Sequence, residues 1–283
     1  MFQPGGPLVA SLVARLSLAG SPVRISSNHR RSIALLKSQG GVATVVKGIG
    51  WVHGPPWVYV SPKDLQLCFG LLDWISGNRE AKVSNWFESN GLFATRVRFC
   101  KLLDPDELSL LGLRAPPRFK DGSLVNPCVL VSDAISALRV DDYVPSRHEL
   151  WKSEFFRLNT PSGEVGLDPI SAAREFAKKI ARNIESYQRL GVVNDSLSPD
   201  NVTLAGEVTD FEWVYVPGIP LPDGSTDSFL DDRQRKEAVY FIDIMVALCE
   251  GLGIAVPIET LASWGLEVSG CDTPFSRELG GLR

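Results

Sequence analysis

The stretch from Gly191 to Val214, which reads GVVNDSLSPDNVTLAGEVTDFEWV, limits what this chain can fold into more than any other. A Ser-Pro turn precedes Asp200 and Asn201, and a short β-branched segment, a glycine turn and a second short segment then lead to Asp210. Short β-prone segments around a glycine turn are typical of a hairpin. The pattern therefore predicts a tight hairpin with Asn201 and Asp210 at its open end.

An amide oxygen and a carboxylate at one hairpin mouth suit a Mg²⁺ ion, which prefers oxygen ligands and takes several of them from water and phosphate. Kinase-like folds hold Mg²⁺ with a catalytic-loop Asn and with the Asp of an Asp-Phe-Gly motif. Here Asp210 is followed by Phe211. The alternative is that Asn201 and Asp210 serve only as turn residues. This segment alone leaves both interpretations open.

The length and net charge of the chain limit the class of protein to which it can belong. A chain of 283 residues with 44% apolar content can bury a sizeable core, as one large domain or as two lobes. Its formal net charge of −4 argues against a general nucleic-acid binder, because such proteins neutralise phosphates with a clustered basic surface. We therefore expect no nucleic-acid partner.

Cysteine and histidine usage predicts neither a zinc site nor a disulfide framework. The five cysteines are widely spaced without a CxxC pair, and the three histidines do not cluster. A reducing compartment fits best. The apolar N-terminal stretch has no basic segment before it and is interrupted by Arg15, so it is interpreted as a helix rather than a signal peptide. No apolar run is long enough for a membrane span, and we expect a soluble cytoplasmic protein.

The expected fold class is α+β with two lobes. We expect a β-rich N-lobe at residues 1–133 and a mostly helical C-lobe, which contains the Asn201/Asp210 hairpin, at residues 134–283. The strands are predicted at 33–36, 42–46, 57–60, 96–103 and 129–131. The helices are predicted at 7–18, from 62 to a stop at Ser76-Gly77, around Glu80 up to Asn90-Gly91, from Asp168-Pro169 to Gly191, at 232–248 and at 258–264. Residues 104–127, 146–168 and 216–227 are predicted as loops or insertions.

Four separated blocks resemble the selenoprotein O-like protein adenylyltransferases, a family with a protein-kinase-like fold. The resemblance spans about residues 26–250, and the order and spacing of the blocks make it more specific than any block alone. The blocks are VVKGIG at 45–50, the segment from Arg79-Glu80 through Gly91 to Ala94-Thr95-Arg96, the arginine block from Val129 to His148, and the metal loop from Gly191 to Asp210.

The resemblance implies a role for each matching residue. Lys47 would bind nucleotide phosphates and Glu80 would hold the lysine. Asn201 and Asp210 would ligate Mg²⁺, and Asp200 would be the catalytic base for a hydroxyl nucleophile. Two arginines would contact phosphate, namely Arg139 and, as the least direct match, Arg31. In that family ATP lies reversed relative to ordinary kinases, so a hydroxyl of a protein or small molecule attacks the α-phosphorus and AMP is transferred.

Several positions depart from the family pattern. Ser132 stands where the family has a second phosphate-binding arginine, Asn194 replaces a histidine, and Phe211-Glu212 replaces Tyr-Gly. Ser196 occupies the base position of ordinary kinases, which leaves Asp200 as the nearby replacement. Three alternatives stay open: a kinase-like phosphotransferase, a pseudokinase that binds nucleotide or acts as a scaffold, and an unrelated α+β protein.

Overall fold

A computed structural model of the chain describes residues 23–24, 32–35, 42–48, 72–110, 124–143, 148–160, 168–221, 230–268, 270 and 272–282. They belong to two compact units. The sheet unit comprises Met1–Lys82 and Arg96–Ala137, and the helical unit comprises Val83–Thr95 and Leu138–Arg283. The described residues form a mixed α+β structure with antiparallel strand pairing.

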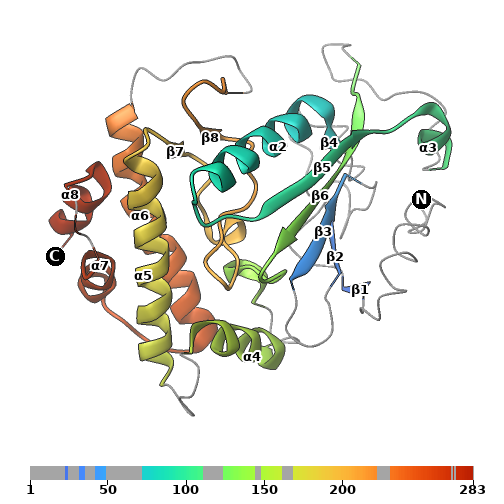
Figure 1. The fold of residues 1–283 in the computed structure, drawn as a ribbon. Helices are drawn as coiled ribbons and strands as arrows, with labels where there is room; N and C mark the ends of the chain where they lie inside the picture. Colours follow the sequence, from blue (N-terminus) through green and yellow to red (C-terminus); the bar gives the residue numbers. More distant parts are fainter. Residues whose placement is uncertain are drawn as a thin grey trace. The chain divides into compact units, whose positions relative to one another are not determined.

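The sheet unit is built around one antiparallel sheet with the order β1-β2-β3-β6-β4, in which β5 also pairs with β6 (Figure 1). Most of the central strand β6 is buried, as expected for a strand with neighbours on both edges. The strands are β1 (Val23–Arg24), β2 (Ser32–Leu35), β3 (Ala43–Lys47), β4 (Leu72–Asp73), β5 (Arg96–Leu102) and β6 (Pro127–Ala134).

The pattern of apolar runs predicted most of this sheet. The strands expected at 33–36 and 42–46 are present as β2 and β3, which pair in antiparallel fashion with Ser32 opposite Lys47. The expected strand from Arg96 is present as β5. The short strand expected at 129–131 is longer in the structure, because β6 pairs with β3, β4 and β5 along its length. The predicted strand at 57–60 and the predicted helix at 7–18 lie outside the described residues.

The predicted helix stop at Ser76-Gly77 is wrong, because helix α2 runs without interruption from Trp74 to Ser89. Asp73 starts the helix: its carboxylate accepts the backbone N–H of Ile75 at 2.8 Å, as an N-cap residue does. A Cβ atom at Gly77 would lie 2.5 Å from the sulfur of Cys128, so a glycine is needed for close packing of the helix rather than for its end.

The helical unit packs its helices around one large apolar core. Helix α5 lies beside α6, and α7 and α8 pack against the same pair (Figure 1). The helix predicted from Asp168-Pro169 is present as α5, and the carboxylate of Asp168 caps its N-terminus. One face of α5 is buried, with Phe176, Ile180, Ile184 and Tyr187 at spacings of four, four and three residues. The helices are α4 (His148–Asn159), α5 (Pro169–Gln188), α6 (Leu230–Leu252), α7 (Ile258–Leu266) and α8 (Pro274–Gly281).

Two segments predicted as loops contain helices. Helix α3 (Pro105–Leu110) lies within 104–127, and α4 lies within 146–168. Trp151 and Phe155, four positions apart on α4, are fully buried in the core of the helical unit, which outweighs the polar composition of the segment. Helix α8 was not predicted; Thr273 caps it and a proline follows at its first position.

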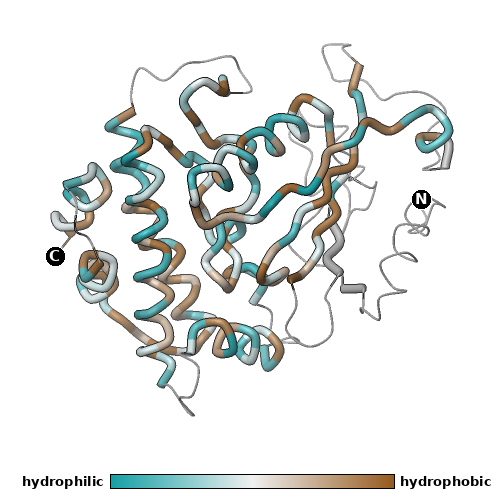
Figure 2. Tube along the Cα trace, viewed as in Figure 1, coloured by the Kyte–Doolittle hydropathy of each residue, from teal (hydrophilic) through white to brown (hydrophobic). Residues whose placement is uncertain are grey.

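Helices α5 and α6 alternate between hydrophilic and hydrophobic residues along their length (Figure 2), and most of their buried residues are apolar. The helices are thus amphipathic, as helices packed on one side are. In the described part of the chain, no helix is both long and apolar enough to cross a bilayer.

Candidate active site

The sheet unit contributes an ion pair between Lys47 and Glu80. Strand β3 ends at Lys47, whose Nζ lies 2.6 Å from Oε1 of Glu80 on α2. The two side chains are only 13% and 4% exposed. Burial strengthens the attraction between the two charges, but removing them from water costs solvation free energy. The main effect of the pair is therefore to hold the two side chains in one geometry.

The chain leaves Lys47 through Gly48, which has a φ of +89°. A Cβ atom there would lie 2.2 Å from the carbonyl oxygen of Cys128 on β6. Both the backbone angle and the lack of space require glycine at this position. Gly48 therefore lies directly against the neighbouring strand β6, and Lys47 is the last residue of β3.

The helical unit contains the predicted hairpin. Val202 and Val208 form an antiparallel bridge, and the N–H of Thr209 donates to the carbonyl of Asn201 at 3.0 Å. The turn is closed at Gly206, which has a φ of +90°. The flanking segments pair through this single bridge rather than as full strands. The prediction that Asn201 and Asp210 stand at the hairpin mouth is confirmed.

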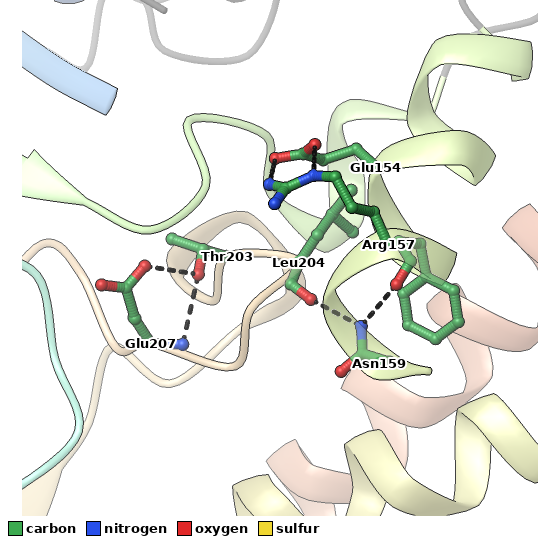
Figure 3. Close-up of polar contacts among 7 residues, drawn as sticks. Glu154, Arg157, Asn159, Thr203, Leu204 and Glu207 are labelled. Carbon is green, nitrogen blue, oxygen red and sulfur yellow. Dashed lines mark hydrogen bonds and ion pairs between the residues drawn. The ribbon is translucent and has the colours of Figure 1, made fainter. Parts of the chain in front are cut away.

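Side chains tie this hairpin to itself and to α4 (Figure 3). The Thr203 hydroxyl donates to the Glu207 carboxylate at 3.1 Å and accepts the Glu207 N–H at 3.2 Å. The buried Asn159 amide, at the end of α4, donates to the carbonyls of Leu204 and Phe155 at 2.9 Å each. The hairpin is therefore anchored at its turn end, away from Asn201 and Asp210.

Two hydrogen bonds fix the amide of Asn201. Its Nδ2 donates to the carbonyl of Ser196 at 2.8 Å, and its Oδ1 accepts from the Arg139 guanidinium at 3.3 Å. An amide oxygen has two lone pairs, so Oδ1 can accept from Arg139 and still ligate a cation.

Arg139, predicted to bind phosphate, takes part in building this loop. Its guanidinium is largely buried and also donates to the carbonyl of Asp200. Its own carbonyl accepts the indole N–H of Trp151 at 3.0 Å, and its N–H donates to Asp142. Arg139 therefore brings a positive charge beside Asn201 and holds the backbone at Asp200.

Asp210 has a φ of +61° and is the single non-glycine residue with a positive φ among the described residues. Such backbone conformations are strained for an L-residue and persist where the surroundings enforce them, often at functional sites. One enforcing contact is the Ser196 hydroxyl, which donates to the Asp210 carbonyl at 3.1 Å. Ser196 thus connects the loop start to Asp210.

A buried carboxyl that sequence reasoning missed anchors the start of the loop. Glu237 on α6 is fully buried and accepts the N–H of Asn194 at 2.6 Å and the amide of Gln188 at 2.5 Å. Burial raises the pKa of Glu237 to about 8, although these hydrogen bonds oppose the shift. The side-chain oxygen Oδ1 of Asn194 in turn accepts the N–H of Ser196 at 3.0 Å. A chain of contacts thus leads from α6 to Asp210.

Asp200 lies at the surface of the same loop, where the Ser198 hydroxyl donates to its carboxylate. Burial, followed by the negative charges of Asp200 and Asp142, raises the pKa of Asp141. Asp141 and Asp200 therefore lie near enough to influence each other. Asp141 was also missed, although it is two residues from Arg139 in the sequence.

The structure thus brings Lys47 and Glu80 together in the sheet unit. In the helical unit it brings together Arg139, Asp200 and Asn201. Asp210 directly follows Thr209, whose N–H donates to the carbonyl of Asn201. Arg31 lies outside the described residues. In the described ranges, no group of three or more His, Cys, Asp or Glu side chains is placed to hold a metal ion.

No family model and no curated protein matches the chain. Among solved structures, the chain is similar to a crystal structure of a Stt7 homolog from Micromonas algae soaked with ATP. The two are 12% identical with a TM-score of 0.44, over 87% of this chain and 74% of the other. Similarity of this degree assigns no function to the chain.

Proposed function

We propose that the protein is an ATP- and Mg²⁺-dependent transferase with a kinase-like fold, and that it transfers AMP to a hydroxyl of a protein or small molecule. The observation that carries the proposal is the Lys47–Glu80 ion pair. A desolvated lysine held by a helix carboxylate is the arrangement by which kinases orient a lysine toward nucleotide phosphates. As a stabilising device it is a poor choice, because burying two charges costs about as much as their attraction returns.

The residues at the hairpin mouth fit the metal that such a reaction needs. Asn201 offers an amide oxygen and Asp210 a carboxylate, both hard ligands, and Mg²⁺ takes its remaining ligands from phosphate and water. Bound there, the ion would neutralise charge on the phosphates. The guanidinium of Arg139, beside Asn201, would add positive charge at the same place.

Asp200 is the proposed base. The hydroxyl oxygen of the acceptor would attack the α-phosphorus, its proton would pass to the Asp200 carboxylate, and pyrophosphate would leave. The Ser196 hydroxyl lies within hydrogen-bond distance of both Oδ1 of Asn194 and the Asp210 carbonyl, so its single proton is already engaged, and an alcohol is a weak base. A positioning role suits Ser196 better than proton abstraction.

Labelled ATP tests the reaction. We expect transfer of label from α-³²P-ATP, and none from γ-³²P-ATP, to the protein itself or to an acceptor in a lysate, with loss of the signal when EDTA removes Mg²⁺. Transfer of the γ-label instead would establish a phosphotransferase. If neither label is transferred and ATP with Mg²⁺ does not raise the melting temperature, the proposal fails.

A second prediction concerns the ion pair. Glu80→Gln is expected to lower the ATP-induced rise in melting temperature by at least half, because the neutral amide no longer holds the charged Lys47. The measurement is thermal unfolding with and without ATP and Mg²⁺. Glu88→Gln is the control, since Glu88 is an exposed carboxylate on the same helix. An unchanged ATP effect in Glu80→Gln would show that Lys47 is not oriented for the nucleotide by this carboxylate.

The second candidate function is nucleotide binding without transfer. The hydrogen bonds of the Arg139 guanidinium favour this function. The guanidinium already donates to Asp200 and Asn201, so fewer of its N–H groups remain to stabilise charge on a phosphate during transfer. Stabilisation by ATP with Mg²⁺ but no transfer of either label would support this binding module over the transferase.

A further inference from the structure

Two cysteines of the sheet unit lie in contact beneath helix α2. In the register of β5 and β6, Cys100 stands opposite Leu130 and Leu102 opposite Cys128, so the two cysteines are diagonal neighbours on one face. A Cβ atom built on Gly77 would lie 2.5 Å from the sulfur of Cys128 and 3.0 Å from that of Cys100. Both sulfurs therefore meet the same point of α2.

The two thiols differ in reactivity. Cys128 is fully buried, whereas Cys100 is partly exposed. The S–H group of Cys128 donates to the Cys100 sulfur, which lowers the pKa of Cys100 against the opposing effects of burial and of the Glu80 charge. The same hydrogen bond, together with burial, raises the pKa of Cys128. The thiolate is the nucleophilic form of cysteine, so Cys100 is the reactive member of the pair.

We propose that Cys100 and Cys128 form a peroxide-responsive pair that closes to a disulfide. A partly exposed thiolate beside a second thiol is the arrangement that redox-sensing cysteines use. The Cys100 thiolate attacks hydrogen peroxide and gives a sulfenic acid and hydroxide. The Cys128 sulfur then attacks the sulfenic sulfur, the S–S bond forms and water leaves. The hydrogen bond to the Cys100 sulfur is the main cause of the raised pKa of Cys128. Once Cys100 is an uncharged sulfenic acid, this hydrogen bond weakens and the Cys128 thiol ionises more readily.

Closing the bond must move the elements around it. Diagonal neighbours in an antiparallel pair stand about 7–8 Å apart at Cα, whereas disulfides span about 4.4–6.8 Å. Strands β5 and β6 must therefore approach, and the sulfurs must shift against Gly77. Glu80 lies three residues beyond Gly77 on the same helix, and Lys47 stands opposite Leu130 on β6. Oxidation is thus expected to disturb the Lys47–Glu80 ion pair.

The covalent step is tested on the reduced protein with one equivalent of hydrogen peroxide, followed by alkylation, digestion and mass spectrometry. We expect a disulfide between the peptides of Cys100 and Cys128 that dithiothreitol reverses. Cys128→Ser, which keeps a hydrogen-bond donor beside the Cys100 sulfur, should stop the reaction at a sulfenic acid on Cys100 that dimedone traps, and Cys100→Ala should leave Cys128 a thiol.

Cys249 is the internal control, because it is buried and its pKa is raised to about 11 by burial. Cys100 should react at least about tenfold faster than Cys249, since it carries the larger thiolate fraction. Equal rates, or a disulfide of Cys100 with Cys68 or Cys271 in place of Cys128, would overturn the proposal.

The effect on Lys47 and Glu80 rests on the proposed function and has its own measurement. The rise in melting temperature with ATP and Mg²⁺ is expected to fall at least twofold on oxidation and to recover with dithiothreitol. A disulfide that leaves this rise unchanged would refute the coupling. The absence of any rise in reduced protein would refute nucleotide binding, and the disulfide would still be decided by mass spectrometry.

Discussion

Asp210→Asn is expected to lower the rate of transfer from ATP by at least about 100-fold while leaving the fold intact. The substitution removes the carboxylate charge that would bind Mg²⁺. Asparagine adopts positive φ angles more readily than most residues, so it fits the backbone of Asp210, with its φ of +61°. The measurement is the rate of label transfer from α-³²P-ATP at saturating Mg²⁺, together with the melting temperature.

The choice of substitution matters for this test. Asp210→Ala would add strain at a positive φ and would mix a loss of stability with a loss of metal binding. Asp232→Asn is the matched control, because the side chain of Asp232 on α6 is 71% exposed. Full activity in Asp210→Asn would remove Asp210 from the proposed metal site, whereas equal loss in both variants would point to an effect unrelated to the loop.

Glu237→Ala is expected to lower the free energy of unfolding by about 3 kcal/mol, because two buried donors lose their acceptor and a cavity forms. The donors are the N–H of Asn194 and the amide of Gln188. Urea denaturation measures the change. Glu250→Ala, an exposed position on the same helix, should stay within about 0.5 kcal/mol of the parent. A similarly small change in Glu237→Ala would show that Glu237 does not anchor the loop.

The same residue predicts a pH dependence. The pKa of Glu237 is raised from 4.5 to about 8 in the folded protein, mainly by burial. Between these values the folded state binds a proton that the unfolded state has released. The contribution of Glu237 to stability is therefore complete below pH 4.5 and is lost as pH rises toward about 8. Urea denaturation across this range should show a fall in stability that is smaller in Glu237→Gln; equal slopes would contradict the shift.

Local signals predicted much of this structure. The hairpin around Gly206, the helix capped by Asp168 and the strand that ends at Lys47 each depend on residues close in sequence. Turn glycines, a capping carboxylate and apolar periodicity determine such elements without reference to the rest of the chain. The positions of Asn201 and Asp210 at the hairpin mouth followed from the same local pattern.

Long-range contacts explain what the sequence did not reveal. A glycine after a serine is a common helix end, and only the sulfur of Cys128 on a distant strand shows why Gly77 lies inside α2. Glu237 looks like any surface glutamate of an amphipathic helix, yet it accepts the N–H of Asn194, 43 residues away. The contacts of the Arg139 guanidinium with Asp200 and Asn201 likewise join residues 61 and 62 positions apart.

The two hydrogen bonds of Asn201 have a consequence for affinity. Because its nitrogen is tied to Ser196 and its oxygen faces Arg139, the rotamer is already selected when the chain folds. Immobilising a free side chain on binding costs about 0.5–1.5 kcal/mol, and that entropy is lost here before any cation arrives. The loop is thereby preorganised, and a cation that binds Asn201 meets an oxygen that needs no reorientation.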